Sequence, residues 1–518
     1  MNKKKVVNML YLLVGVIGFS LAPFKIDNPV WIAAWIAPIF MIRFMRSTRW
    51  IPAIVVGFLA LQTAQFAALL PMMDMMESST VKMDASFLLI MQVRSGMLFL
   101  ALSYLVALVL DKALHKHQPR FAASLVYPSA VVAMELLFSL TTGVIGTVGD
   151  SQYAISPLVM IASLFGVLGV SFFVSWLAPV INALWEGGWH LGNMGLSGKT
   201  YAVIMAGLLI YGGLAVAFPQ EAERSVLVAG ITLENGFFER MGDSDLYVDE
   251  LFALDPAGAA AVMSSPQSHV DEMWEKTHEA IAAGAKIIVW QEYALCLESS
   301  AADALLREIQ TLADEADVYL LVSYGRLLNE AERDDRVMIN MSVLFTPDGE
   351  IGWEYAKAYP APGYEEFMIE AGDRDIPYVD TPYGRIGQVI CADMYFPHYI
   401  RQAAVKEIGL LLVPTLDTQS MTPLATYSSG YRAVENGFTM VKVTGDGLSA
   451  VTDPAYRHWA RQNSFVQGTP NLYATVPVVS HATVHSRGGY VFPYAAVLLL
   501  ILSGAWAALR ARRRASVG

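Results

Sequence analysis

The sequence has few charged residues and only two cysteines. Of its 518 residues, 16% are charged and 55% are hydrophobic. A soluble globular chain usually has about 25% charged residues, so this low content argues against an ordinary water-soluble enzyme. The formal net charge of -12 argues against a generic nucleic-acid-binding protein, because neutralising phosphates requires an excess of lysine and arginine. The composition leaves association with a membrane open.

The charges are distributed unevenly along the chain. Residues 219–487 carry a net charge of -21, whereas residues 1–218 and 488–518 together carry +9. The basic part contains long apolar runs, and the acidic part has the composition of a water-soluble domain. We therefore predict a polytopic α-helical membrane domain with about seven transmembrane helices over 1–218. An exoplasmic α/β domain follows over 219–487, and a C-terminal transmembrane helix with a basic cytoplasmic tail over 488–518.

Eight apolar segments are long enough to cross a bilayer, which takes about 20 helical residues. They are residues 6–24, 30–46, 50–73, 87–110, 124–145, 157–185, 200–218 and 489–510. The first segment resembles a signal peptide, because Lys3, Lys4 and Lys5 precede it. Six further predicted spans follow it before residue 219, so we predict that this segment is a retained membrane anchor and not a cleaved signal peptide.

The basic residues of the membrane part predict its orientation. If the N-terminus is cytoplasmic, 14 of its 17 basic residues fall at cytoplasmic positions, and only Lys25 and Lys82 fall outside. The positive-inside rule then predicts that both termini are cytoplasmic. We expect a protein of the plasma (inner) membrane with residues 219–487 on its outer, periplasmic face.

Two charged residues fall within predicted spans. Arg94 lies in the fourth and Glu135 in the fifth. A charge at membrane depth is costly and normally faces a partner or a wet cavity. Two interpretations stay open: a structural pair that joins two helices, or a substrate-binding cavity for a lipid headgroup with Arg94 facing a phosphate.

Residues 219–487 alternate apolar strands with polar helices. Strands are predicted at 225–233, 285–294, 318–327, 386–390, 409–415 and 439–445, a hairpin at 338–356, and helices at 267–284, 300–315, 397–407 and 424–437. This order is typical of an α/β domain whose sheets are covered by helices. We find no phosphate-binding loop, no dinucleotide fingerprint and no histidine or cysteine spacing of a metal site, so we expect no cofactor and no metal.

The two cysteines, Cys296 and Cys391, allow two interpretations. On an oxidising side of the membrane they are able to form a disulfide. Alternatively Cys391 is a free nucleophile, because it directly follows the apolar strand 386–390 at a strand-to-helix turn, where α/β folds often place reactive groups. Cys296 is then a packing residue.

Three segments resemble the Glu-Lys-Cys signature of the nitrilase (carbon-nitrogen hydrolase) superfamily. Glu292 ends KIIVWQE, Lys357 lies in EYAKAYPAPGYE, and Cys391 opens CADMYFP. The later segment RAVENG at 432–437 is similar to a helix of that superfamily. The resemblance implies an α-β-β-α sandwich in which these three residues are catalytic.

The layout of the whole chain resembles the apolipoprotein N-acyltransferase family. Segments 22–38, 127–137 and 149–172 look like its membrane segments, and 441–454 looks like its strand-turn-strand near the site. Glu365 follows Lys357 by eight residues, the spacing of a second essential glutamate in that family.

Four departures from the family pattern fall around the acyl pocket and the acceptor entrance. They are Gln291 in place of proline, Ala392 in place of an aromatic residue, Asp393 in place of glutamate, and the loop 414–421.

The resemblance implies acyl transfer through a thioester. The acyl donor is a phospholipid, the acceptor is the amine of a diacylglyceryl lipoprotein, and the enzyme is expected to be a monomer in the lipid bilayer. Cys391 is the nucleophile, Glu292 the base and Lys357 the cation that lowers the thiol pKa and stabilises the oxyanion. Glu365 is expected to orient Lys357 or the incoming amine. The alternative is a membrane-anchored amidase or nitrilase in which water resolves the thioester.

Four further residues are candidates with two interpretations each. Asp393 either fixes the turn that carries Cys391 or touches the substrate. Trp353, Tyr355 and Met394 either line the acyl pocket or pack in the core.

Overall fold

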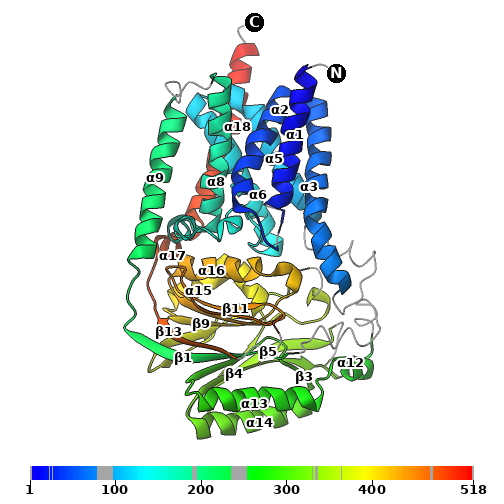
Figure 1. Cartoon of the computed structure of the whole chain (residues 1–518), viewed down its shortest axis with the longest axis vertical. Coiled ribbons are helices and arrows are strands. Elements are labelled where there is room, and N and C mark those ends of the chain that lie inside the picture. The colour runs from blue at the N-terminus through cyan, green and yellow to red at the C-terminus, as the bar shows by residue number, and fades with distance from the viewer. Residues whose placement is uncertain are drawn as a thin grey trace. The chain divides into compact units, whose positions relative to one another are not determined.

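The protein is described by a computed structural model that comprises two compact units (Figure 1). The helical unit contains Met1–Met72, Gly96–Phe218 and Arg487–Gly518, and the α/β unit contains Met73–Ser95 and Pro219–Ser486. The structure describes residues 3–22, 24–25, 27–78, 97–188, 195–234, 254–329, 331–332, 336–362, 365–466 and 471–515.

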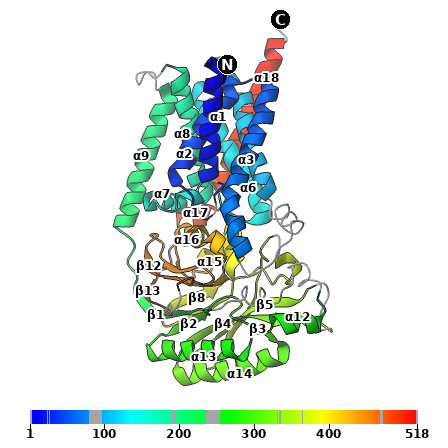
Figure 2. The same cartoon turned by 45° about the vertical axis from the view of Figure 1, so that its right-hand side comes forward.

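The long helices of the helical unit run alongside one another (Figure 2). They are α1 (Lys3–Leu21), α2 (Trp31–Ser47), α3 (Trp50–Ser78), α5 (Met97–Leu114), α6 (Arg120–Thr142), α8 (Ala162–Glu186), α9 (Gly195–Ala217) and α18 (Val491–Ala515). Helix α6 is central, because it contacts α5, α8 and α18. The short α7 (Ser156–Val159) contacts α8 and α9.

Within the described residues, six helices are long and apolar enough to cross a membrane. They are α1, α3, α6, α8, α9 and α18. Helix α2 is shorter, with 17 residues, and corresponds to the predicted span 30–46. The predicted span 87–110 is described only from Met97 onward, as α5, and Arg94 lies outside the described residues. The chain is therefore a membrane protein with several candidate spans.

One predicted span is interrupted. The predicted span 157–185 corresponds to the candidate span α8, which begins at Ala162, and the short helix α7, which ends at Val159, precedes it. A further break lies inside α8 at Gly166, which has φ 72° and ψ 172°. L-residues rarely adopt a positive φ, so glycine allows this kink at little steric cost.

Two mixed β-sheets form the α/β unit. The first has the order β13-β1-β2-β4-β5-β6, and β3 also pairs with β4. Its strands are β1 (Arg224–Ile231), β2 (Ile287–Trp290), β3 (Leu295–Glu298), β4 (Tyr319–Leu327), β5 (Met338–Phe345), β6 (Ile351–Ala356) and β13 (Leu472–Val478). The second has the order β12-β11-β10-β9-β8-β7. Its strands are β7 (Tyr378–Thr381), β8 (Gly384–Gln388), β9 (Leu410–Leu416), β10 (Thr439–Gly445), β11 (Leu448–Thr452) and β12 (His458–Asn463).

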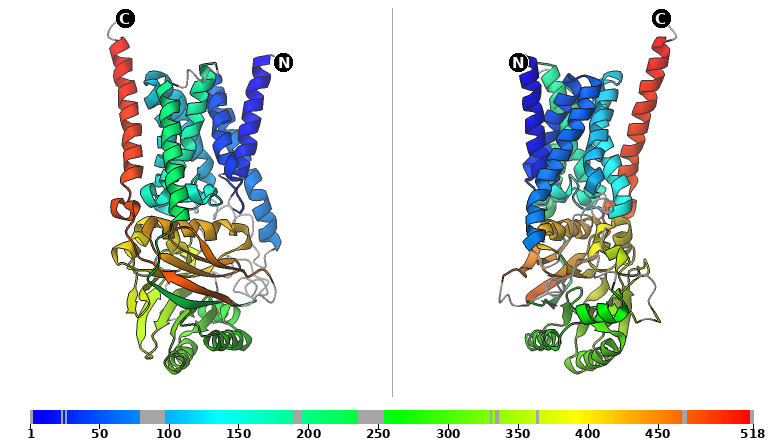
Figure 3. Two further views of the ribbon diagram at one scale, coloured as in Figure 1. Left: turned by 60° about the vertical axis from the view of Figure 1, so that its left-hand side comes forward. Right: turned by 90° about the vertical axis from the view of Figure 1, so that its right-hand side faces the viewer.

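The two sheets pack against each other between two pairs of helices (Figure 3). Helices α13 (Gln267–Ala282) and α14 (Ser299–Ala316) cover the first sheet through a core that includes Trp290 and Ile309. Helices α15 (Pro397–Val405) and α16 (Leu424–Asn436) lie on the side of the second sheet (Figure 1). Two further helices among the described residues are α12 (Pro256–Met263) and α17 (Val484–Gly488). This arrangement confirms the predicted α-β-β-α sandwich.

The strand ends bring the chemically interesting residues together. Strands β1, β2 and β4 are parallel in the first sheet, and β8, β9 and β10 are parallel in the second. Glu292 follows β2 and Cys391 follows β8, so both lie at carboxyl ends of parallel strands. The predicted hairpin is confirmed as β5 and β6, and Lys357 directly follows β6.

Candidate active site

Lys357 lies between two carboxylates in the interior of the α/β unit. Its Nζ is 2.8 Å from Oε1 of Glu292 and 2.6 Å from Oε2 of Glu365. All three side chains are 1% exposed. The two carboxylate partners compensate the hydration that the Lys357 ammonium loses on burial.

Glu292 is held at both oxygens. Oε1 accepts hydrogen bonds from Lys357 and from Nδ2 of Asn340, the latter at 2.7 Å, and Oε2 accepts one from the backbone N–H of Leu416 at 2.6 Å. Burial raises the pKa of Glu292 and the Glu365 carboxylate adds to this, while the Lys357 ammonium opposes both. A buried glutamate with a raised pKa suits a general base that must also release its proton.

The pKa of Glu365 is shifted in the opposite direction to that of Glu292. Burial raises its pKa, but the Lys357 ammonium and several hydrogen bonds outweigh burial, so its net pKa is lowered. The hydroxyl of Tyr293 donates to Oε1 over 2.7 Å, and the backbone N–H of Ala361 donates to Oε2 over 2.6 Å. Glu365 is therefore the stable counterion of Lys357.

Cys391 begins a short 3₁₀ turn, η5 (Cys391–Tyr395), with a φ of 44°. Such left-handed backbone at a non-glycine residue costs about 1–3 kcal/mol and recurs at functional sites. Its Sγ lies 3.9 Å from the carbonyl oxygen of Leu416. Leu416 thus contacts Glu292 through its N–H and Cys391 through its carbonyl.

The resting thiol is not pre-ionised. Burial raises the pKa of Cys391 well above its usual range, and the Glu292 carboxylate raises it further. Lys357 lowers this pKa, as expected from the sequence, but it does not outweigh burial. The thiol therefore needs a base to remove its proton during the reaction, which is chemistry that Glu292 is able to supply.

Asp393 fixes the turn that carries Cys391. Its Oδ2 accepts the N–H of Ile390 at 2.9 Å and the hydroxyl of Tyr355 at 2.6 Å, and its Oδ1 accepts the N–H of Tyr359 at 2.8 Å. Burial raises the pKa of Asp393 to about 7, against the effect of these donors. The contacts support the turn-fixing interpretation of Asp393.

The other sequence candidates of this unit are buried. The Trp353 indole donates to Gln388, and Tyr355 also contacts the Tyr399 hydroxyl at 2.8 Å. Met394 is 1% exposed. These contacts favour core packing for all three residues, and an acyl pocket formed by them stays a prediction. Both cysteines are free thiols, so the alternative of a disulfide is not realised.

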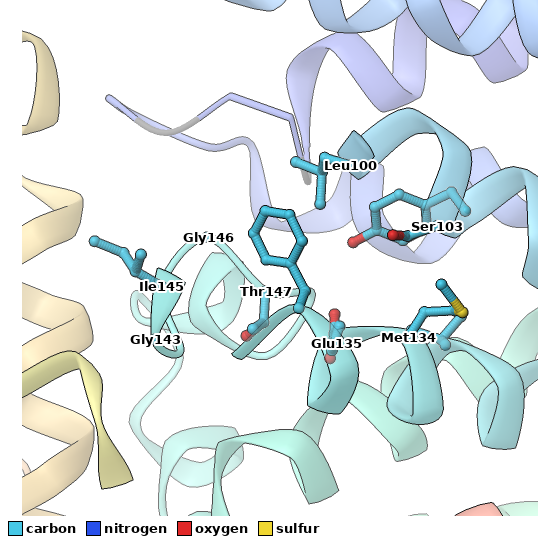
Figure 4. Close-up of a pocket in the computed structure, with 11 residues that line it drawn as sticks. Leu100, Ser103, Met134, Glu135, Gly143, Ile145, Gly146 and Thr147 are labelled. Carbon is cyan, nitrogen blue, oxygen red and sulfur yellow. The ribbon is translucent and has the colours of Figure 1, made fainter. Parts of the chain in front are cut away.

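In the helical unit, Glu135 lines a small cavity between α5, α6 and the segment 143–147 (Figure 4). Its Oε1 accepts the backbone N–H of Val148 at 2.9 Å. The cavity volume of about 20 Å³ is room for one water molecule. Because Arg94 is not described, the predicted pairing of Arg94 with Glu135 and their role in substrate binding stay predictions.

Sequence reasoning missed three groups that complete the buried cluster. Asn340 donates to Glu292 and also reaches Glu365 Oε1 at 3.2 Å, Tyr293 holds Glu365, and the backbone of Leu416 holds Glu292. Tyr293 is adjacent to Glu292 in sequence and has a positive φ of 50°, and its hydroxyl donates to Glu365. Among the described residues, no cluster of three or more histidine, cysteine or acidic side chains has the geometry to hold a metal ion.

The geometry supports acyl transfer through a thioester. A thiol lies beside a carboxylate of raised pKa and a buried ammonium, which together supply a nucleophile, a base and a positive charge for an oxyanion.

Two family models match the chain, and they follow each other in sequence. The model described as apolipoprotein N-acyltransferase N-terminal domain matches residues 15–180, and the model described as carbon-nitrogen hydrolase matches residues 258–483. The apolipoprotein N-acyltransferase of Pasteurella multocida is 23% identical over 69% of this chain and 69% of that protein.

The chain belongs to the apolipoprotein N-acyltransferase family. The family member from Rickettsia prowazekii is 23% identical over 42% of this chain and 47% of its own length, so the chain spans about half of that relative. A citrullinase of Francisella tularensis is 33% identical over 16% of this chain and 30% of that protein.

Among solved structures, an amidase from Nesterenkonia sp. matches 50% of this chain and 92% of its own chain. The match has 18% identity and a TM-score of 0.39. The sandwich fold itself follows from the two observed sheets and from the carbon-nitrogen hydrolase match.

Proposed function

We propose that this protein transfers an acyl chain from a phospholipid to the N-terminal amine of diacylglyceryl-cysteine in lipoproteins. The observation that carries the proposal is the buried Glu292–Lys357–Glu365 cluster beside Cys391, in a chain that also has the N-terminal membrane region of the apolipoprotein N-acyltransferase family.

In the first half-reaction Cys391 attacks the ester carbonyl of the phospholipid. Glu292 removes the thiol proton, a C–S bond forms and the ester C–O bond breaks. The lysophospholipid leaves as an alcohol after taking the proton from Glu292. Lys357 stabilises the oxyanion of the tetrahedral intermediate, because its ammonium is fixed by two carboxylates and needs no rearrangement as charge develops.

In the second half-reaction the acceptor amine attacks the thioester. A C–N bond forms, Glu292 takes a proton from the nitrogen, and the C–S bond breaks. The proton on Glu292 returns to the Cys391 thiolate, whose raised pKa favours the thiol. The enzyme is thereby restored without a cofactor.

The proposed setting is the plasma (inner) membrane with the α/β unit on the outer, periplasmic face. The support is the basic residues of the helical unit, most of which fall at positions that are cytoplasmic in this orientation. Both substrates carry lipid chains, so a site anchored by spanning helices meets them in the bilayer. We propose that the enzyme acts as a monomer.

A hydrolase is the second candidate. Some relatives are amidases by name, such as an N-carbamoylputrescine amidase of Solanum tuberosum, which is 32% identical over 21% of this chain and 35% of that protein. In that case water, rather than an amine, resolves the thioester on Cys391.

Mass spectrometry of lipoprotein N-termini separates the two candidates. Cells depleted of their own N-acyltransferase are complemented with this chain or with its Cys391→Ala variant. The proposal predicts three acyl chains per lipoprotein with the intact chain and two with the variant. Two chains in both strains, together with measurable release of ammonia from small amides by the purified protein, contradicts the proposal and favours the hydrolase.

A further inference from the structure

A second buried ion pair lies next to the proposed catalytic residues. Nζ of Lys442, on β10, donates to Oδ2 of Asp417 over 2.7 Å and contacts Oγ1 of Thr426 at 3.3 Å. Lys442 is 1% exposed and Asp417 is 4% exposed. Taking two charges out of water is costly and hydrophobic residues often pack equally well, so a buried pair at this place calls for a specific role.

The residue before Asp417 touches both halves of the reaction centre. The N–H of Leu416 donates to Oε2 of Glu292 over 2.6 Å, and its carbonyl oxygen lies 3.9 Å from Sγ of Cys391. A small shift of Leu416 therefore disturbs its contacts with both the proposed base and the proposed nucleophile.

Asp417 ties this segment to the neighbouring strand at three points. Its N–H donates to the carbonyl oxygen of Gly445 at 3.1 Å and lies 3.2 Å from Oγ1 of Thr444. Its side chain adds the ion pair with Lys442. Because Thr426 lies on α16, the pair joins the end of β9 to β10 and to the helix that covers them.

We propose that Asp417 and Lys442 are positioning residues that fix Leu416 between Glu292 and Cys391 and balance charge beside the thiol. The inference rests on the proposed role of Cys391 as nucleophile. It adds an ion pair that the Glu-Lys-Cys signature does not contain.

The charged groups around the Cys391 thiol predict in which direction each substitution moves its pKa. Besides burial, the carboxylates of Glu292, Asp417 and Glu365 raise the pKa of Cys391, and the ammonium of Lys357 lowers it. Neutralising Asp417 removes one of the negative charges that raise the pKa of Cys391. Neutralising Lys442 leaves the Asp417 carboxylate without its counterion, so its effect on the thiol grows.

The test follows the alkylation of Cys391 by iodoacetamide in the full chain in detergent, between pH 6 and 11. Peptide mass spectrometry separates this site from Cys296. The midpoint of the pH profile reports the ionisation of the thiol, and it does not depend on how accessible the sulfur is. We expect D417N to move the midpoint down, and K442Q to move it up, by about half a pH unit or more each. K442R keeps the charge and should stay at the wild-type midpoint.

The matched control is D317N, which neutralises the exposed ion pair of Asp317 with Lys286 and should leave the midpoint unchanged. A merely structural role predicts lower thermal stability for D417N and K442Q without opposite shifts. Midpoints that stay in place, or that move in the same direction, overturn the proposal. If K442Q does not fold, the shift in D417N decides. Since no acyl substrate is used, a failure here is distinct from a failure of the proposed acyl transfer.

Discussion

Lys357 lies closer to Glu365 than to Glu292, with Nζ–O distances of 2.6 and 2.8 Å. The pKa of Glu365 is lowered and that of Glu292 is raised, so the two carboxylates beside one ammonium are electrostatically different. Two acids whose surroundings separate their pKa values usually have separate roles. This relationship supports the proposed roles of Glu292 as the base and of Glu365 as the permanent counterion.

Glu365→Gln tests this assignment. The Glu365 carboxylate is one of the groups that raise the pKa of Glu292, so its loss moves the acid limb of the pH–rate profile to lower pH. Lys357 also loses a charged partner, and we expect kcat/KM to fall by about 10²- to 10³-fold. The measurement is the pH dependence of kcat/KM with a synthetic diacylglyceryl peptide.

Glu366→Gln is the matched control, because it is the same substitution one residue along at an exposed position. We expect its rate and its pH profile to stay within twofold of the parent enzyme. Residual activity in Glu365→Gln whose acid limb stays at the parent pH would contradict the assignment of Glu292 as the base.

The two cysteines provide a direct test of the nucleophile. Cys391→Ala should remove the acyl-enzyme completely, and Cys391→Ser should retain less than about 1% of the rate, because an alcohol is far less ionised than a thiol at neutral pH. Intact-protein mass spectrometry after incubation with phospholipid detects the added acyl mass. Cys296→Ala is the control: this residue is fully buried in β3, and the variant should still form the thioester. An acyl adduct that persists in Cys391→Ala contradicts the mechanism.

The raised pKa of Asp393 leads to a prediction of how the free energy of unfolding of the α/β unit depends on pH. Its pKa is about 7 in the folded protein and near 3.8 for a free aspartate, so between these values the folded state holds a proton that the unfolded chain releases. The contribution of this group to the free energy of unfolding therefore falls as pH rises from about 4 to about 7, by at most about 1.4 kcal/mol per pH unit.

Asp393→Asn should remove this slope. It should also lower the free energy of unfolding by about 1–3 kcal/mol, because a single amide oxygen cannot accept every N–H group that the carboxylate accepts. Denaturant titrations of the full chain in detergent, followed by tryptophan fluorescence at several pH values, measure both effects. Asp303→Asn, at an exposed site on α14, should keep the parent slope. A slope that survives in Asp393→Asn assigns the proton to another group.

The sequence predicted the elements whose signal is local. Strands β1 and β4 and the β5–β6 hairpin follow from apolar runs and from the turn at Pro347-Asp348-Gly349. The meeting of Glu292, Lys357, Glu365 and Cys391 followed from a resemblance of short motifs, and the structure brings these four into one cluster.

Other features depend on contacts that no local pattern contains. Strand β13 pairs antiparallel with β1, from which it is separated by most of the α/β unit, and β3 has only four residues. Asn340 faces the active centre only because of the register of β5 with β4 and β6. The raised pKa of Cys391 results from burial, which composition does not reveal. The sequence predicted that Lys357 lowers the pKa of the thiol, and it does, but burial outweighs this effect in the folded site.

The close approach of Gly445 to Gln291, the residue before Glu292, predicts that the two positions are sterically coupled. A Cβ atom at this glycine would lie 2.5 Å from Nε2 and 2.7 Å from Cδ of Gln291, whose Oε1 accepts the N–H of Leu233 at 2.9 Å. Gly445→Ala must therefore displace the Gln291 side chain, and we expect a loss of about 1–3 kcal/mol in the free energy of unfolding together with reduced turnover.

The double variant Gly445→Ala/Gln291→Ala separates this clash from a general effect of the new methyl group. Removing the Gln291 side chain makes room for the Cβ, so the cost of the alanine at position 445 should become smaller in the Gln291→Ala background than in the parent. The control is Gly207→Ala on α9, where a Cβ meets no atom within 4 Å and alanine is the better helix former, so the variant should be neutral or slightly stabilising. Equal costs of Gly445→Ala in both backgrounds contradict the coupling. In that case the Gln291 side chain does not transmit the effect of the new methyl group to Glu292.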